Sequence, residues 1–138
     1  MSHHYIIPLV PMTTNNSYHI INIPLKDGSG RTRPAIMLTG DAKKWMERAI
    51  QELQVQRMQA HAQMLRCRCS ILLVVYRVTD VGDVDNYSKG VLDAIAKAGI
   101  IENDRLFKDM RVILKVDKSN PRTVITINEL AHDGELFT

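Results

Sequence analysis

The chain has no long apolar run, and no segment approaches the roughly 18 consecutive apolar residues that a membrane-spanning helix requires. Its start, MSHHYIIPLVPMTTNN, lacks the basic residues and the extended apolar stretch of a secretory signal peptide. Cysteine is scarce: Cys67 and Cys69, with His61 nearby, are too few ligands for a structural zinc ion. We therefore expect a cytoplasmic protein without membrane segments, whose two thiols are reduced and half-buried.

Two common binding loops are also missing. Residues 26–32, KDGSGRT, lack the Gly-Lys-Ser/Thr ending of a phosphate-binding P-loop. After Asp83 and Asp85, Tyr87 and Ser88 stand where a calcium-binding EF-hand needs an oxygen ligand and a glycine. The sequence therefore argues against a P-loop nucleotide enzyme and against an EF-hand protein.

Neither sign of charge dominates the whole chain, but the charges are unevenly distributed. The net charge is +3, and the last ten residues, ELAHDGELFT, hold three acids and no lysine or arginine. The rest of the chain therefore has 18 basic and 12 acidic residues. Such a basic body is compatible with a polyanionic partner, and ordinary solubilising charge is the alternative explanation.

No internal repeat, low-complexity tract or interdomain linker divides the chain, so we expect one domain over residues 1–130 and an acidic C-terminal tail over 131–138.

The apolar run CSILLVVYRV indicates a central strand that is buried on both faces. Pro8 places the first strand at an edge of the sheet or ends it early, and Thr39 or Asp41 is expected to cap the first helix. Gly99 is expected to end the second helix. The expected strands are 5–10, 17–25, 34–39, 69–78, 106–118 and 122–130, and the expected helices are 41–64 and 85–98.

This element order predicts an α/β (α+β) domain in which two main helices pack on a mixed β-sheet. Residues 26–34, KDGSGRTRP, are expected to form a flexible loop between two of the strands.

The stretch GDVDNYSKGVLDAI concentrates acids between the central strand and the second helix. In extended backbone, Asp83 and Asp85 point to the same side, and two converging carboxylates suit Mg²⁺, which prefers oxygen ligands. Lys89 and Asp93 follow Asp85 at four-residue intervals, so the three share one helix stripe. Asp104 follows the helix, and the pattern alone does not show whether it returns to the same place.

The same residues also have an explanation that involves no metal ion. Asp85 would then be the residue that caps the helix, which is worth about 1 kcal/mol. Asp85 and Lys89 would form an exposed ion pair worth about 0.3–0.5 kcal/mol.

The spacing of these residues resembles the signature of the RusA-type Holliday junction resolvase family. Every spacing of that signature is matched here, by Asp83, Asp85, Asn86, Lys89, Asp93, Ala94 and Asp104. The segments PMTTNNSY, which contains Asn15, and GRTRPAIMLTGDAKKW resemble two further family segments. The chain departs from the family at Gly82, where a basic residue is frequent, and at Asn103, where a second aspartate is frequent. Met12 and Thr13 differ from the usual proline and serine.

The resemblance implies a homodimeric, Mg²⁺-dependent endodeoxyribonuclease, encoded by a bacterium or a phage, that resolves four-way DNA junctions by paired symmetric nicks in recombination and repair. It implies that Asp83, Asp85 and Asp104 are catalytic acids that bind the metal, with Mn²⁺ as a possible substitute. Lys89 would be a catalytic lysine, and Asn86, Asp93 and Asn15 would support the site.

Several basic residues could follow the DNA phosphates, although each is also explained as a solvated charge. Three other protein classes stay open: a non-catalytic junction or single-strand binder, another Mg²⁺ enzyme acting on nucleotides, and a purely structural α/β protein. The candidate DNA-binding residues are Lys26, Arg31, Arg33, Lys43, Lys44, Lys97, Arg105 and Lys108.

Overall fold

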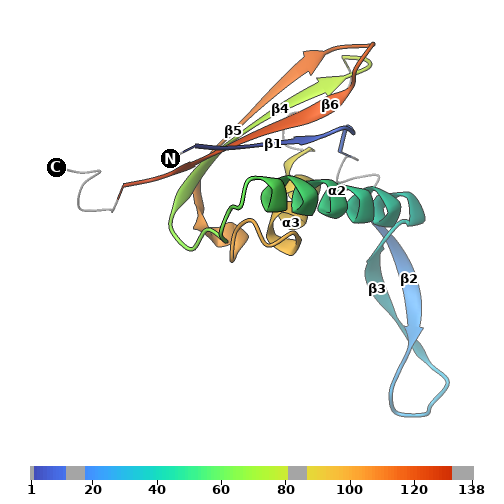
Figure 1. Cartoon of the computed structure of the whole chain (residues 1–138). Coiled ribbons are helices and arrows are strands. Elements are labelled where there is room, and N and C mark those ends of the chain that lie inside the picture. Colours follow the sequence, from blue (N-terminus) through green and yellow to red (C-terminus); the bar gives the residue numbers. More distant parts are fainter. Residues whose placement is uncertain (1, 12–17, 81–86, 132–138) are drawn as a thin grey trace.

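The structure is a computed structural model that describes residues 2–11, 18–80 and 87–131. Two α-helices lie on one side of a four-stranded sheet, and a two-stranded ribbon projects from this body (Figure 1). The predicted α+β fold with two helices on a mixed sheet is therefore confirmed. The strands are β1 (Ser2–Ile7), β2 (Tyr18–Pro24), β3 (Thr32–Leu38), β4 (Cys69–Arg77), β5 (Phe107–Val116) and β6 (Arg122–Glu129). The helices are α2 (Gly40–Gln59), α3 (Ser88–Lys97) and the 3₁₀ helix η2 (Asp104–Leu106).

The four-stranded sheet has the order β1-β6-β4-β5. The β1–β6 and β6–β4 pairs are antiparallel, whereas β4 and β5 run parallel. β4 thus lies inside the sheet, as its apolar run predicted. β1 lies at an edge and ends at Ile7, directly before Pro8, which has no backbone N–H to offer to a strand partner.

The prediction that β4 is buried on both faces is wrong for one of them. Cys69, Ile71, Leu73 and Val75 are buried, whereas the residues that alternate with them are half-buried. The cause is that both helices cover the same side of the sheet, which leaves the opposite face without a helix layer (Figure 1).

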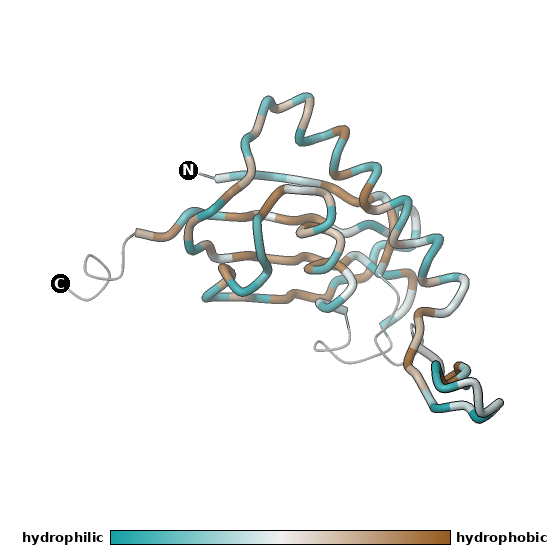
Figure 2. The backbone as a smooth tube through the Cα atoms, turned by 90° about the horizontal axis from the view of Figure 1, so that it is seen from below, coloured by the Kyte–Doolittle hydropathy of each residue, from teal (hydrophilic) through white to brown (hydrophobic). Residues whose placement is uncertain are grey.

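The helices close the core with residues at helical spacing. Hydrophobic and hydrophilic residues alternate along the turns of α2 (Figure 2), and its buried residues are Ala42, Met46, Ala49 and Leu53. The Thr39 hydroxyl accepts a hydrogen bond from the Ala42 N–H at 3.2 Å, so the predicted cap is confirmed. α2 ends at Gln59 rather than at the predicted Met64.

The second helix is also shorter than predicted. α3 begins at Ser88, and Tyr87, not Asp85, occupies its N-cap position, without a capping bond from its side chain. Its end agrees with the prediction, because Gly99 follows the helix with φ of +77°, a conformation that favours glycine. The Arg57 guanidinium donates hydrogen bonds to the Ala98 and Gly99 carbonyls, both at 3.2 Å, which ties the end of α2 to the end of α3.

β2 and β3 form a separate antiparallel ribbon rather than extending the main sheet. Ordered pairing begins at Thr32, opposite Pro24, so the predicted loop over residues 26–34 is shorter than expected. Within the described part of the chain, no helix is long and apolar enough to cross a membrane.

Candidate nuclease site

Four of the predicted site residues lie outside the described part of the chain. They are Asn15, Asp83, Asp85 and Asn86. Their proposed roles, and the alternative ion pair between Asp85 and Lys89, stay predictions from the sequence.

Lys89 and Asp93 lie one turn apart on α3. Lys89 is exposed and Asp93 is half-buried, whereas Val91, Ala94 and Ile95 of the same helix are buried in the core. Of the predicted polar stripe, Lys89 and Asp93 therefore lie on the less buried side of α3, Lys89 is at the surface of its first turn, and Asp85 lies outside the described residues.

Asp104 is the first residue of η2 and is exposed. The neighbouring Asn103 side chain accepts the hydrogen bond of the Arg105 N–H at 2.9 Å, so it caps this short helix. At position 103, the RusA-type family that the sequence resembles frequently has aspartate. The side-chain oxygen of Asn103 makes the capping hydrogen bond without adding a negative charge.

The described residues that flank the acidic segment lie at the carboxyl end of β4. There the buried Arg77 donates to the Asp80 carboxylate at 2.7 Å, and its guanidinium carbon lies 5.6 Å from the centre of the Tyr87 ring. Sequence reasoning did not single out Arg77, although an arginine three residues before an aspartate at a strand end was a usable signal. Arg77 thus contacts described residues on both sides of the acidic segment, Asp80 before it and Tyr87 after it.

Asp104 lies in η2, which contacts α3 and leads into β5. The first residue of β5, Phe107, pairs with Cys69 at the start of β4. Within residues 2–11, 18–80 and 87–131, no three His, Cys, Asp or Glu side chains are grouped so that they could hold a metal ion. A complete acidic site is therefore not formed by the described residues alone.

The candidate DNA-binding cations are all exposed and lie in separate regions. Lys26 and Arg31 are in the loop of the ribbon, where Arg31 pairs with Asp27 at 3.4 Å. The others are Arg33 on β3, Lys43 and Lys44 in the first turn of α2, Lys97 in the last turn of α3, Arg105 in η2 and Lys108 on β5.

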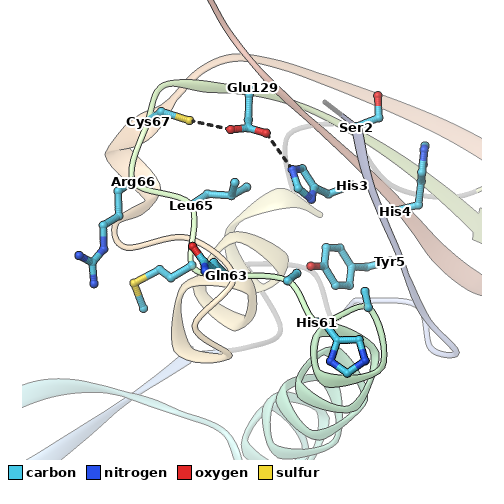
Figure 3. Close-up of a pocket in the computed structure, with 13 residues that line it drawn as sticks. Ser2, His3, His4, Tyr5, His61, Gln63, Leu65, Arg66, Cys67 and Glu129 are labelled. Atoms are coloured by element: carbon cyan, nitrogen blue, oxygen red, sulfur yellow. Dashed lines mark hydrogen bonds and ion pairs between the residues drawn. The ribbon is translucent and has the colours of Figure 1, made fainter.

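A cavity of about 880 Å³ lies elsewhere, between the start of β1, residues 60–67 and the end of β6. In it, the Glu129 carboxylate lies between the Cys67 thiol at 3.6 Å and the His3 ring at 3.2 Å (Figure 3). The His3 hydrogen bond is the main cause that lowers the pKa of Glu129.

Burial, followed by the neighbouring Cys67, raises the pKa of the Cys69 thiol to about 12. Both cysteines are free, Cys69 buried and Cys67 partly so, which agrees with the predicted reduced thiols.

A protein family and a phage protein match parts of this chain. The family described as Endodeoxyribonuclease RusA matches residues 26–128. Over 48 residues the chain is 46% identical to a protein named crossover junction endodeoxyribonuclease rusA from Enterobacteria phage HK97. That stretch is 35% of this chain and 40% of the phage protein, so the chain spans less than half the length of this curated relative. Because the family match covers most of the chain, from the ribbon loop to β6, the chain belongs to the endodeoxyribonuclease RusA family.

Proposed function

We propose that this protein is a structure-specific endodeoxyribonuclease that resolves four-way DNA junctions. The observation that carries the proposal is the family match over residues 26–128, because this range contains Asp83, Asp85, Lys89 and Asp104 at the spacing of the family signature. The partial relative, whose name is crossover junction endodeoxyribonuclease, supports the same activity.

The proposed cofactor is Mg²⁺, held by the carboxylates of Asp83, Asp85 and Asp104, with Mn²⁺ as a substitute. Carboxylate oxygens are the ligands that this cation prefers, and Asp104 is exposed at a position where Asn103 performs the capping, which leaves the Asp104 carboxylate accessible. When bound, the cation supplies a water of lowered pKa as nucleophile and stabilises phosphoryl charge. The Lys89 ammonium, exposed on the first turn of α3, is proposed to stabilise charge that develops on the phosphoryl or leaving oxygen.

The substrate proposal rests on charge and symmetry. The exposed cations of the ribbon loop, of the start of α2 and of the η2–β5 region offer contacts to the DNA backbone. Resolution of a four-way junction needs cuts in two strands related by approximate two-fold symmetry. A homodimer with two-fold symmetry provides two sites in matching positions.

A gel assay tests the proposal with a synthetic four-way junction and a linear duplex of the same sequence. We expect symmetric nicks in the junction with Mg²⁺ or Mn²⁺, no nicks with EDTA, and little cleavage of the duplex. Junction binding without nicks in either metal would favour the non-catalytic binder, and equal cleavage of both DNAs would remove the structure specificity.

A further inference from the structure

Among residues 2–11, 18–80 and 87–131, Arg77 is the one charged residue that is buried, with 5% of its surface exposed. It ends β4 and continues the row of Ile71, Leu73 and Val75, so its side chain lies on the face that the helices cover (Figure 1). Removing a guanidinium from water costs free energy that an ion pair recovers only in part. A contribution to stability is therefore a poor explanation for Arg77, and its partners point to another one.

The partners of Arg77 lie on both sides of the acidic segment. Its guanidinium donates to the Asp80 carboxylate at 2.7 Å and lies 5.6 Å from the centre of the Tyr87 ring. Asp80 is the last described residue before this segment, and Tyr87 is the first one after it. One side chain thus contacts both flanks of the six residues that include Asp83 and Asp85.

The contact with Tyr87 also reaches the start of α3. Tyr87 is buried in the N-cap position and makes no capping hydrogen bond with its side chain, so packing has to hold this end of the helix. From α2, the Trp45 ring lies so close that a Cβ on Gly90 would be 3.4 Å from it. From β4, Arg77 contacts Tyr87, two residues before Lys89. The first turn of α3 is therefore held by one helix and by the end of one strand.

We propose that Arg77 is a positioning residue of the nuclease site, which through Asp80 and Tyr87 holds the flanks of the acidic segment and the turn that carries Lys89. The inference rests on the proposed nuclease function and adds to it a residue that acts through its neighbours. A buried guanidinium does not follow DNA phosphates as the exposed cations do. Its support still matters for the rate, because a misplacement of about 1 Å in a site can cost about 100-fold.

The first test is Arg77→Met, which keeps a long unbranched side chain and removes the charge. The Asp80 side chain is 87% exposed, so the variant leaves no buried charge without a partner, and we expect the free energy of unfolding to stay the same or to rise. Single-turnover cleavage at saturating junction and Mg²⁺ should nevertheless fall at least tenfold. The dissociation constant of the junction in EDTA should stay within twofold of the wild-type value. A residue that only stabilised the fold would lower stability, binding and cleavage together.

Arg122→Met is the matched control. Arg122 also pairs with an aspartate, Asp117 at 3.0 Å, and its guanidinium carbon lies 3.8 Å from the centre of a tyrosine ring, that of Tyr76. Tyr76 directly precedes Arg77 in β4, so the two side chains point to opposite faces of the sheet. Arg122→Met therefore removes the same kind of contact away from α3, and it should cleave at the wild-type rate.

A second measurement needs neither DNA nor a metal ion. The amides of residues 91–93 bond to carbonyl groups at the start of α3, so their hydrogen exchange reports how firmly this turn is held. We expect exchange at these amides to become at least tenfold faster in Arg77→Met and to stay at the wild-type rate in Arg122→Met.

Tyr87→Leu tests whether the effect passes through the ring. If Arg77 acts through Tyr87, the double variant Arg77→Met/Tyr87→Leu should lose less cleavage than the product of the two single losses. Single losses that simply multiply would show that the two residues act independently, which would overturn this path.

Three further outcomes would overturn the proposal: wild-type cleavage by Arg77→Met, a loss of cleavage that only follows a loss of folded protein, or unchanged exchange at residues 91–93. A failure of the nuclease function looks different. A wild-type protein that cuts no junction, together with faster exchange in Arg77→Met, would remove the nuclease function and leave the hold of Arg77 on α3 in place. Junction cleavage that Arg77→Met leaves intact would keep the nuclease and remove Arg77 from its site.

Discussion

At the scale of single residues, Asp104 is the proposed metal ligand that the structure describes. Asp104→Asn keeps the size of the side chain and removes its charge, so we expect the cleavage rate to fall at least 100-fold, about 2.7 kcal/mol of transition-state stabilisation. Junction binding in EDTA should persist, because other cations hold the DNA. Single-turnover cleavage and a gel-shift titration measure the two quantities. Glu102→Gln is the control, since Glu102 is an exposed acid two residues away; wild-type cleavage by Asp104→Asn would remove this residue from the site.

Glu129 allows a prediction of pH dependence. The His3 hydrogen bond lowers the pKa of Glu129 from its ordinary value of 4.5. A group whose pKa is lowered by folding stabilises the folded state above the unfolded pKa and loses this contribution as the pH falls through the folded value. We therefore expect Glu129→Gln to reduce stability near pH 6, and the difference from wild type to vanish as the pH falls below 4.5. Urea unfolding at several pH values measures it, and a difference that grows at low pH would contradict the assignment.

The acidic residues of the site stay a prediction from the sequence, and the sequence did not predict how they are arranged. Asp83, Asp85 and Lys89 share a short local pattern, and local spacing fixes which side of a strand or helix a residue occupies. Asp104 is different, because the eleven residues after Asp93 include a helix end, a turn and η2. Only the family signature linked Asp104 to the other acids, and the structure places it in η2, directly before β5.

At the scale of elements, the strands were predicted well because their signals are local. The apolar run of β4 and the proline after β1 are properties of a few adjacent residues. The ends of helices were predicted less well. After Gln59 the chain turns through His61, with φ of 52°, and no glycine or proline marks that turn in the sequence. At the start of α3, Tyr87 offers no capping side chain, so the nearest good capping residue, Asp85, was the natural but incorrect choice.

The end of α3 carries a prediction about stability. Gly99 has φ of +77°, and a Cβ there would lie 2.5 Å from the Arg57 guanidinium, which is held by the Ala98 and Gly99 carbonyls. We expect Gly99→Ala to reduce the free energy of unfolding by about 1–2 kcal/mol, because a residue with a Cβ is strained in this conformation. Gly40→Ala is the matched control: Gly40 begins α2, and a Cβ there meets nothing within 4 Å. Urea unfolding compares the two, and equal stabilities would contradict the role of Gly99.

At the scale of the whole molecule, the separation of the ribbon of β2 and β3, called the arm, from the main sheet was not predictable from the strands themselves. β2 and β3 have apolar residues like those of the main sheet, and they were expected to belong to one mixed sheet, whereas they pair only with each other among the described strands. Which strand joins which sheet depends on contacts between distant parts of the chain, and local patterns do not encode these contacts. The consequence is a molecule whose cations are divided between the tip of the arm and the body.

This division predicts how DNA binding depends on salt. If the tip of the arm contacts phosphates, replacing Lys26 and Arg31 by glutamine removes two cation–phosphate contacts, each contributing about 0.9 to the slope of log K against log salt. We expect junction binding to weaken and the slope to become shallower by about 2 for each subunit that binds, with the cleavage rate at saturating DNA unchanged. Lys115→Gln/Lys118→Gln is the matched control, because both lysines are exposed and lie near the turn between β5 and β6. Gel-shift titrations from low to moderate salt measure the slopes. An unchanged slope in the Lys26/Arg31 variant would show that the tip of the arm does not touch the DNA, and the DNA contacts would then belong to the cations of the body.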